Sequence, residues 1–206
     1  MSKVKLIWAT PDGENLIAYM ARVSNPGNQD NKDTAPKLLK YLIDNKHWSP
    51  FEMVNVCMEI ETTRDIARQM LRHRSFSFQE FSQRYAIASE SEFSQPRLQD
   101  CKNRQNSIEV EDRELYRYWW SLQQTVLSTS LDAYHQALDN GIAKEVARKV
   151  LPEGIMLSRL YMNGTLRSWL HYLDVRCDKA TQKEHRDVAD KCKVVIESLF
   201  PSLFKE

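Results

Sequence analysis

The sequence has too few glycines to build the loops that usually hold phosphate groups. Its 206 residues contain five, at positions 13, 27, 141, 154 and 164, and none belongs to a GxGxxG turn or a Walker A loop. A bound phosphate must therefore be held by side-chain donors, and the guanidinium group of arginine suits that task best.

Metal-binding patterns are missing as well. The cysteines lie far apart, without the paired spacing of a zinc site or a redox motif, and no HExxH sequence occurs. We expect reduced thiols, as in a cytosolic protein, and no metal centre. The residues concerned are Cys57, Cys101, Cys177 and Cys192, and His47, His73, His135, His171 and His185.

Long apolar runs and a strong net charge are absent too. No stretch reaches the roughly 20 apolar residues that cross a bilayer, and the first residues lack the apolar core of a signal peptide. Lys and Arg total 29 against 28 Asp and Glu, so no overall field attracts nucleic acid or a membrane surface. These absences favour a cytoplasmic protein with a local binding site.

The pattern of apolar residues predicts the secondary structure. The chain is long enough to bury a core and no repeat or linker divides it, so we expect a single domain over 1–206. Alternation predicts strands at 3–9 and 53–62, and helical spacing predicts helices at 12–23, 34–43, 63–74, 110–140, 142–150, 166–175 and 187–199. Thr34 is expected to cap the second helix. The C-terminal half is therefore expected to be helical, and 86–109 irregular.

A dense group of hydrogen-bond donors lies at 72–84. Arg72, His73, Arg74 and Arg84 occur there in RHRSFSFQEFSQR, with Glu80 as the single carboxylate. Guanidinium and imidazole groups suit an anionic ligand. By composition alone, a solvated basic surface or a patch for single-stranded nucleic acid explains the segment equally well.

Charged and imidazole side chains outside that segment receive plainer interpretations. Arg64 and Arg68 are expected to be solvated or paired with Asp65 and Glu61. His135 and His185 lie on predicted helical faces with no motif around them, and both are expected to be structural. The aromatic residues of 110–140 are expected in the core or in an interface.

The segment at 72–84 resembles the signature of one enzyme family. RHR, seven further residues, Ser82, one residue and Arg84 reproduce RHRx7SxR of the flavin-dependent thymidylate synthases. Similar stretches follow in order: ARVS at 21–24, HWSPFE at 47–52, RQMLRHR at 68–74, EVARKVLP at 145–152 and LRSWLHYLDVR at 166–176. The resemblance therefore extends over most of the chain.

The resemblance implies a fold and an activity. The fold would be α+β, a central mixed β-sheet flanked by helices with a largely helical C-terminal half. The activity would be reductive methylation of dUMP to dTMP, with FAD as cofactor and with methylenetetrahydrofolate and NADPH as co-substrates. It also implies a homotetramer with FAD between subunits, located in the cytoplasm, or in that of the host if the chain is viral.

The matching positions form two overlapping sets. Those resembling FAD-binding residues are His47, Ser49, Arg72, His73, Arg74, Glu80, Thr165, Arg167 and His171. Those resembling residues around dUMP are Gln69, Arg72, Glu80, Ser82, Gln83, Arg84, Arg148 and Arg176. Thr165 stands where many relatives carry Asn.

Arg176 is the predicted catalytic residue. It resembles the residue that polarises N3 of the pyrimidine and stabilises negative charge that develops on the ring. Ser82 is expected to bind rather than to attack, because no base and orienting group for it can be read from the sequence. No cysteine follows a proline, so the Pro-Cys nucleophile of the folate-only thymidylate synthases is missing. No protein nucleophile is expected.

Two other classes of function compete with the enzyme. A single-stranded nucleic-acid-binding module would use the Arg and Phe residues of 72–84, but the near-neutral charge disfavours it, since affinity for a polyanion comes largely from many released counterions. A helical interaction protein would use Arg and aromatic residues only as an interface. An enzyme acting on small molecules, without nucleic-acid or membrane partners, is the leading hypothesis.

Overall fold

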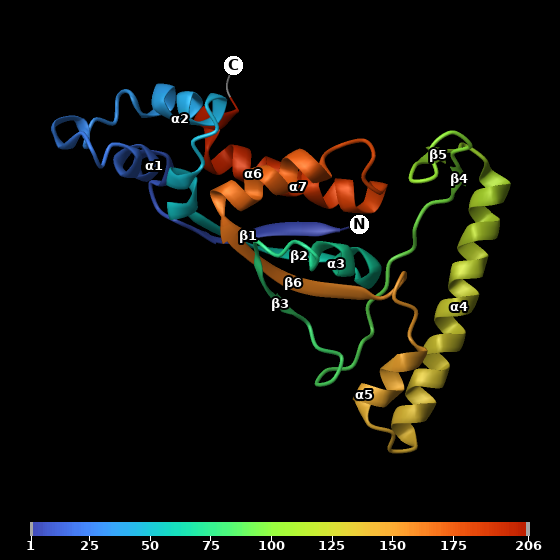
Figure 1. Ribbon diagram of the computed structural model, residues 1–206. Helices are drawn as coiled ribbons and strands as arrows, with labels where there is room; N and C mark the ends of the chain where they lie inside the picture. Colours follow the sequence, from blue (N-terminus) through green and yellow to red (C-terminus); the bar gives the residue numbers. More distant parts are fainter. Residues whose placement is uncertain (1, 205–206) are drawn as a thin grey trace.

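A four-stranded sheet forms the middle of the protein in the computed structural model, which describes residues 2–204. The strand order is β1-β2-β6-β3 (Figure 1). The strands are β1 (Lys3–Ala9), β2 (Asn55–Thr63), β6 (Leu157–Thr165) and β3 (Ser77–Glu80). Helices pack against this sheet, which confirms the predicted α+β class.

The direction of the strands corrects one expectation. All three pairings in the sheet are antiparallel, so the sheet is not mixed in strand direction. Parallel neighbours need a crossover that brings the chain back to the same end of the sheet. Here the chain enters each neighbouring strand from the opposite end.

Strand β6 is the main departure from the predicted helical C-terminal half. Its buried side consists of Ser158, Leu160, Met162 and Gly164. A serine and a glycine at half of these positions hide the apolar alternation that identifies a strand. Gly164 is needed for packing, because a Cβ there would lie 2.5 Å from Cδ1 of Phe76. The short β3 was also missed, since four residues give too little pattern.

Two C-terminal helices lie over the sheet (Figure 1). They are α6 (Leu166–Arg176) and α7 (Lys183–Leu199), and α7 begins about one turn earlier than predicted. Trp169 and Tyr172 of α6 and Val188 of α7 are fully buried in one apolar cluster with Met58 and Met162 of the sheet. This cluster is the main core.

The N-terminal helices are close to their predicted positions. They are α1 (Gly13–Ala21) and α2 (Ala35–Asp44), with a 3₁₀ turn η1 (Pro26–Asn28) between them and η2 (Ser49–Met53) before β2. A last 3₁₀ turn, η4 (Pro201–Leu203), follows α7. Thr34 is the N-cap residue of α2, but its side chain does not bond to the helix. It accepts a hydrogen bond from Arg22 at 2.7 Å, which corrects the predicted side-chain cap.

The segment 86–109 forms a strap with a small hairpin. It pairs Ser91 with Met156 and then forms β4 (Arg97–Gln99) and β5 (Ser107–Glu109). Helix α4 (Arg113–Asp139) follows, capped by Asp112, and Gly141 ends it with a φ of +79°. Next come α5 (Lys144–Ala147) and the 3₁₀ turn η3 (Arg148–Val150).

Helix α4 stands beside the sheet and its helices rather than on them (Figure 1). A second, smaller apolar cluster around Tyr134 joins it to α5 and to Met156. Outside this cluster, Leu122 and Val126 of the predicted apolar side are 40% and 47% exposed, and Trp119 and Trp120 are 37% and 46% exposed. These two tryptophans are therefore not buried in the core of a single chain, and their place in an interface stays a prediction.

Two further observations concern the whole described chain. Cys57, Cys101, Cys177 and Cys192 are all free thiols, as predicted. Within residues 2–204, no helix combines the length and the apolar character needed to cross a bilayer.

Candidate functional site

The RHR triplet lies in the turn that follows α3 (Arg64–Met70). Ile66, Ala67 and Met70 anchor this helix in the core, and the chain then turns toward β3. Arg72 and Arg74 are exposed, and no carboxylate within residues 2–204 pairs with either guanidinium group. Both charges are therefore available to a ligand.

His73 and Arg176 are in direct contact. The Nε–H of Arg176 donates to Nε2 of His73 at 2.9 Å, and the ring of Tyr172 meets that of His73 edge-on with centroids 5.0 Å apart. Burial, helped by the charges of Arg176 and His171, lowers the pKa of His73 to about 4. His73 is thus neutral near pH 7, so its Nε2 carries no proton and can accept the N–H of Arg176.

Gln69 lies beside this pair, at the end of α3. Its Oε1 is 3.2 Å from Nδ1 of His185, and its Nε2 donates to Oε1 of Gln182 at 2.7 Å. The predicted dUMP residue Gln69 and the predicted catalytic residue Arg176 therefore share one neighbourhood, between α3, α6 and α7.

Glu52 joins the segment at 47–52 to the start of α6. It accepts hydrogen bonds from Thr165 Oγ1 and from Arg167 Nη1, each at 2.7 Å. The Thr165 hydrogen bond, together with Arg167, holds the pKa of Glu52 below its usual value against the opposing effect of burial. The sequence interpretation gave Glu52 no role, although it lies inside HWSPFE.

Three other predicted FAD residues lie in or near η2 and α6. His47 precedes η2 and Ser49 begins it; both are exposed, and the His47 ring meets the Tyr41 ring edge-on. His171 is exposed one turn after Arg167 on α6, which puts both side chains on the same face of the helix.

Glu80, at the end of β3, is held from two sides. It accepts from Ser158 Oγ at 2.8 Å and lies 3.5 Å from Nη1 of Arg64. Arg64 is buried and pairs with Glu80 and Glu153, while Arg68 pairs with Glu153 at 2.8 Å. Both alternatives expected for Arg64 were wrong, because a buried guanidinium group is neither solvated nor stable without a carboxylate, and the fold supplies Glu80 and Glu153. Arg68 is exposed, as one alternative had it, but its ion pair is with Glu153 and not with Asp65 or Glu61.

Arg84 and Arg148 meet at one glutamate of α5. Arg84 lies 3.2 Å from the carboxylate of Glu145, and Arg148 Nε donates to the Glu145 carbonyl at 3.3 Å. Ser82 Oγ accepts from the backbone N–H of Arg84, and Gln83 is buried with its Nε2 unpaired. Ser82, Gln83, Arg84 and Arg148 thus form a second group.

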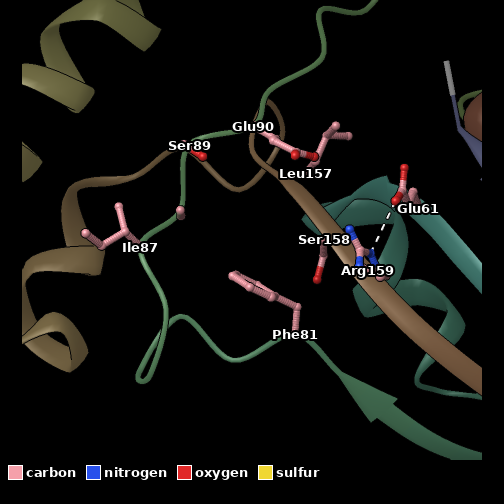
Figure 2. A pocket seen from close by; sticks show the side chains of 9 residues that line it. Glu61, Phe81, Ile87, Ser89, Glu90, Leu157, Ser158 and Arg159 are labelled. Carbon is pink, nitrogen blue, oxygen red and sulfur yellow. Dashed lines mark hydrogen bonds and ion pairs between the residues drawn. The ribbon is translucent and has the colours of Figure 1, made fainter.

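The two groups lie in different parts of the chain. Figure 1 shows α5 well away from α6 and α7. A cavity of about 140 Å³ lies beside the loop after β3. Figure 2 shows the Arg159–Glu61 ion pair on one side of it and Ile87 on the other, with Phe81 between them. None of the predicted site residues lines it. Within residues 2–204, no group of three or more His, Cys, Asp or Glu is placed to hold a metal ion.

The fold is shared with a nucleotide methylase of known structure. The UMP/dUMP methylase PolB of Streptomyces cacaoi, bound with 5-Br dUMP, superposes with a TM-score of 0.86 over 98% of this chain and 93% of its own. The two sequences are 24% identical, so this likeness establishes the fold alone.

The chain belongs to the family described as thymidylate synthase complementing protein, whose family model, Thy1, matches residues 5–202. The flavin-dependent thymidylate synthase of Synechocystis sp. is 52% identical over 92% of this chain and 87% of its own length. The "probable flavin-dependent thymidylate synthase" of Paramecium bursaria Chlorella virus 1 is 49% identical over 93% and 89%. The family resemblance inferred from the sequence is confirmed.

Proposed function

We propose that this chain is a flavin-dependent thymidylate synthase that converts dUMP to dTMP. The observation that carries the proposal is the family match over 5–202, together with a complete RHRx7SxR signature whose Arg72 and Arg74 have no acidic partner in the described chain. Two exposed guanidinium groups in the same turn, without counter-charges, favour an anionic ligand.

The residues present fit a bound FAD. Without a glycine-rich loop, its phosphates need side-chain donors, and Arg72, Arg74 and Arg167 are exposed on the elements concerned. The full proposed set is His47, Ser49, Arg72, His73, Arg74, Glu80, Thr165, Arg167 and His171. When bound, FAD would supply the redox chemistry that links NADPH to the carbon from methylenetetrahydrofolate.

The dUMP set is Gln69, Arg72, Glu80, Ser82, Gln83, Arg84, Arg148 and Arg176. Arg84 and Arg148 provide a pair of guanidinium groups that a phosphate would attract away from Glu145. The unpaired, buried Nε2 of Gln83 is a donor that lacks an acceptor in the single chain, and a ligand or a second subunit would provide one. Both observations support an anionic nucleotide at this group.

The role of Ser82 is binding. Its Oγ accepts from a backbone N–H, and no His side chain bonds to it in the described chain, so nothing there activates it as a nucleophile. This supports a reaction without a protein nucleophile. The single domain over 1–206 and the cytoplasmic location stay predictions.

The site is proposed to be completed by other copies in a homotetramer. Arg176, with Gln69 and His73, lies in one part of the chain, and Arg148, with Ser82, Gln83 and Arg84, lies in another. A site shared between subunits would bring the first set from one subunit together with the second set from another. Trp119, Leu122 and Val126 are exposed on one face of α4 and provide an apolar surface for such a contact.

Changing that surface is expected to break the tetramer. The double variant Leu122→Glu with Val126→Glu places two charges on one face of α4, and desolvating them would oppose association. The expected result is a mass below that of the tetramer by sedimentation velocity, with retained helical content. Val194→Glu, at an exposed apolar position on α7, is the matched control. A double variant that stays tetrameric would exclude α4 from the interface.

The activity itself is tested by release of tritium from dUMP labelled at C5. We expect release, and formation of dTMP, when the purified protein receives FAD, NADPH and methylenetetrahydrofolate, and no dTMP when the flavin is removed. A wild-type protein that carries flavin but neither binds dUMP nor releases tritium would overturn the proposal.

A further inference from the structure

A chain of hydrogen bonds links the buried core to Gln69. His185, in the first turn of α7, is fully buried. Its Nε2 lies 3.1 Å from Tyr172 Oη, and its Nδ1 lies 3.2 Å from Gln69 Oε1. Gln69 Nε2 then donates to Gln182 Oε1 at 2.7 Å. The amide of Gln69 is therefore held at both ends.

The chain continues from Gln182 to an ion pair. Gln182 Nε2 donates to Glu184 Oε2 at 3.1 Å. Glu184 receives both Nη1 and Nη2 of Arg97, at 2.6 and 2.9 Å. Arg97 is on β4, so the otherwise unassigned hairpin at 97–109 connects to the neighbourhood of Gln69.

The charge on Glu184 sets the direction of these bonds. Burial is the largest single effect and raises the pKa of Glu184, but the hydrogen bonds and charge of Arg97, together with the hydrogen bonds from the backbone N–H of Glu184 and from Gln182, hold that pKa below its usual value. A carboxylate only accepts, so Gln182 must present its NH₂ to Glu184 and its oxygen to Gln69. Gln69 must in turn present its NH₂ to Gln182 and its oxygen to His185.

The same reasoning defines the tautomer of His185. Burial, more than the charges of Arg176 and His73, lowers its pKa to about 3, so near pH 7 it carries one ring proton. Because Gln69 Oε1 only accepts, that proton is on Nδ1. Nε2 then accepts the O–H of Tyr172, and every polar atom between Tyr172 and Glu184 has a partner.

We propose that His185, Gln182 and Glu184 are positioning residues that hold the Gln69 amide in one orientation for dUMP. The inference rests on the proposed function, in which Gln69 contacts that nucleotide. One Nε2 hydrogen and one lone pair on Oε1 remain for the ligand. If the Gln69 amide flipped, its NH₂ and its oxygen would exchange places. A ligand that fits one orientation would then meet donor against donor and acceptor against acceptor in the flipped orientation.

Gln182→Met tests the chain at an exposed position. Methionine has a similar length but removes both amide hydrogen bonds, and it leaves the Arg97–Glu184 ion pair in place. Since a net hydrogen bond corresponds to roughly fivefold in an equilibrium constant, we expect KM for dUMP to rise about fivefold while kcat changes less than about twofold. The unfolding temperature should stay unchanged.

A double-mutant cycle separates positioning from a purely structural effect. In the Gln69→Ala background, Gln182→Met should raise KM for dUMP no further, because the group that it positions is gone. Glu184→Gln is the second variant. A glutamine at position 184 both donates and accepts, so it no longer determines whether the NH₂ or the oxygen of Gln182 faces it. Glu109→Gln is the matched control. It removes the ion pair between Glu109 of the hairpin and Lys183 of α7, which is not part of the hydrogen-bond chain from His185 to Arg97, and it should leave KM for dUMP unchanged.

Nitrogen-15 NMR of labelled histidine provides a readout independent of turnover. The expected spectrum shows a proton on Nδ1 of His185 in the wild type and a mixture of tautomers in Glu184→Gln. Two results would overturn the inference and leave the proposed function intact, provided that the wild-type protein binds dUMP by calorimetry. One is that the effects of Gln69→Ala and Gln182→Met on KM are additive, and the other is that His185 carries its proton on Nε2. Wild-type protein that does not bind dUMP would overturn both.

Discussion

Arg176→Ala is expected to lower tritium release from dUMP by about 100- to 1000-fold while the protein keeps its flavin. Arg176 ends α6 half-buried, bonds to a neutral His73, and has no carboxylate partner within residues 2–204. Its charge is therefore not neutralised by the protein. A fixed positive charge of this kind stabilises negative charge that develops on a pyrimidine ring, and truncation removes it.

Two matched variants define what the Arg176 result means. Arg176→Lys keeps a charge but loses the planar fork, and it should recover only part of the activity. Arg104→Ala removes an exposed arginine from the hairpin and should leave turnover unchanged. Flavin content is read from the visible spectrum of each purified protein. Normal tritium release by Arg176→Ala would remove Arg176 from the catalytic role.

Trp169→Ala is expected to destabilise the protein by about 3–5 kcal/mol. Trp169 is fully buried on α6, and its ring lies 4.9 Å from that of Phe76 and 5.8 Å from that of Tyr172, centroid to centroid. Its Nε1–H also donates to the carbonyl of Val56 at 3.0 Å. The change leaves both a cavity and an unpaired carbonyl group inside the core.

The measurement for Trp169 is chemical denaturation followed by circular dichroism. Trp169→Phe should lose less, because it keeps most of the apolar volume while losing the hydrogen bond. Trp8→Ala is the control, since Trp8 is 46% exposed on β1. Equal midpoints for Trp169→Ala and Trp8→Ala would contradict the central place given to Trp169 in the core.

The elements that were predicted correctly carry a strong local pattern. In the predicted strand 53–62, which contains most of β2, Val54, Val56, Met58 and Ile60 alternate with the residues of the other face, and all four are fully buried. The long helix α4 was located because helical spacing persists over many turns and ends at a glycine. Strand β6 was missed because Ser158 and Gly164 occupy buried positions, where close packing rather than hydrophobicity selects the residue.

The sequence by itself determined the family, because the spacing of Arg72, His73, Arg74, Ser82 and Arg84 is a local property that can be read without a fold. It also indicated which side chains are suited to anions, since a guanidinium group stays charged in any environment near neutral pH.

Only the tertiary structure decided which of those side chains meet. Glu80 lies with Arg64, Thr165 with Glu52, and Gln69 with His185, a residue 116 positions away. Periodicity reports on neighbours two to four residues apart, because those residues share a face of one strand or one helix. A partner more than one hundred residues away is selected when whole elements pack, so His185 looked structural in the sequence and came to lie beside the substrate-binding candidate only in the fold.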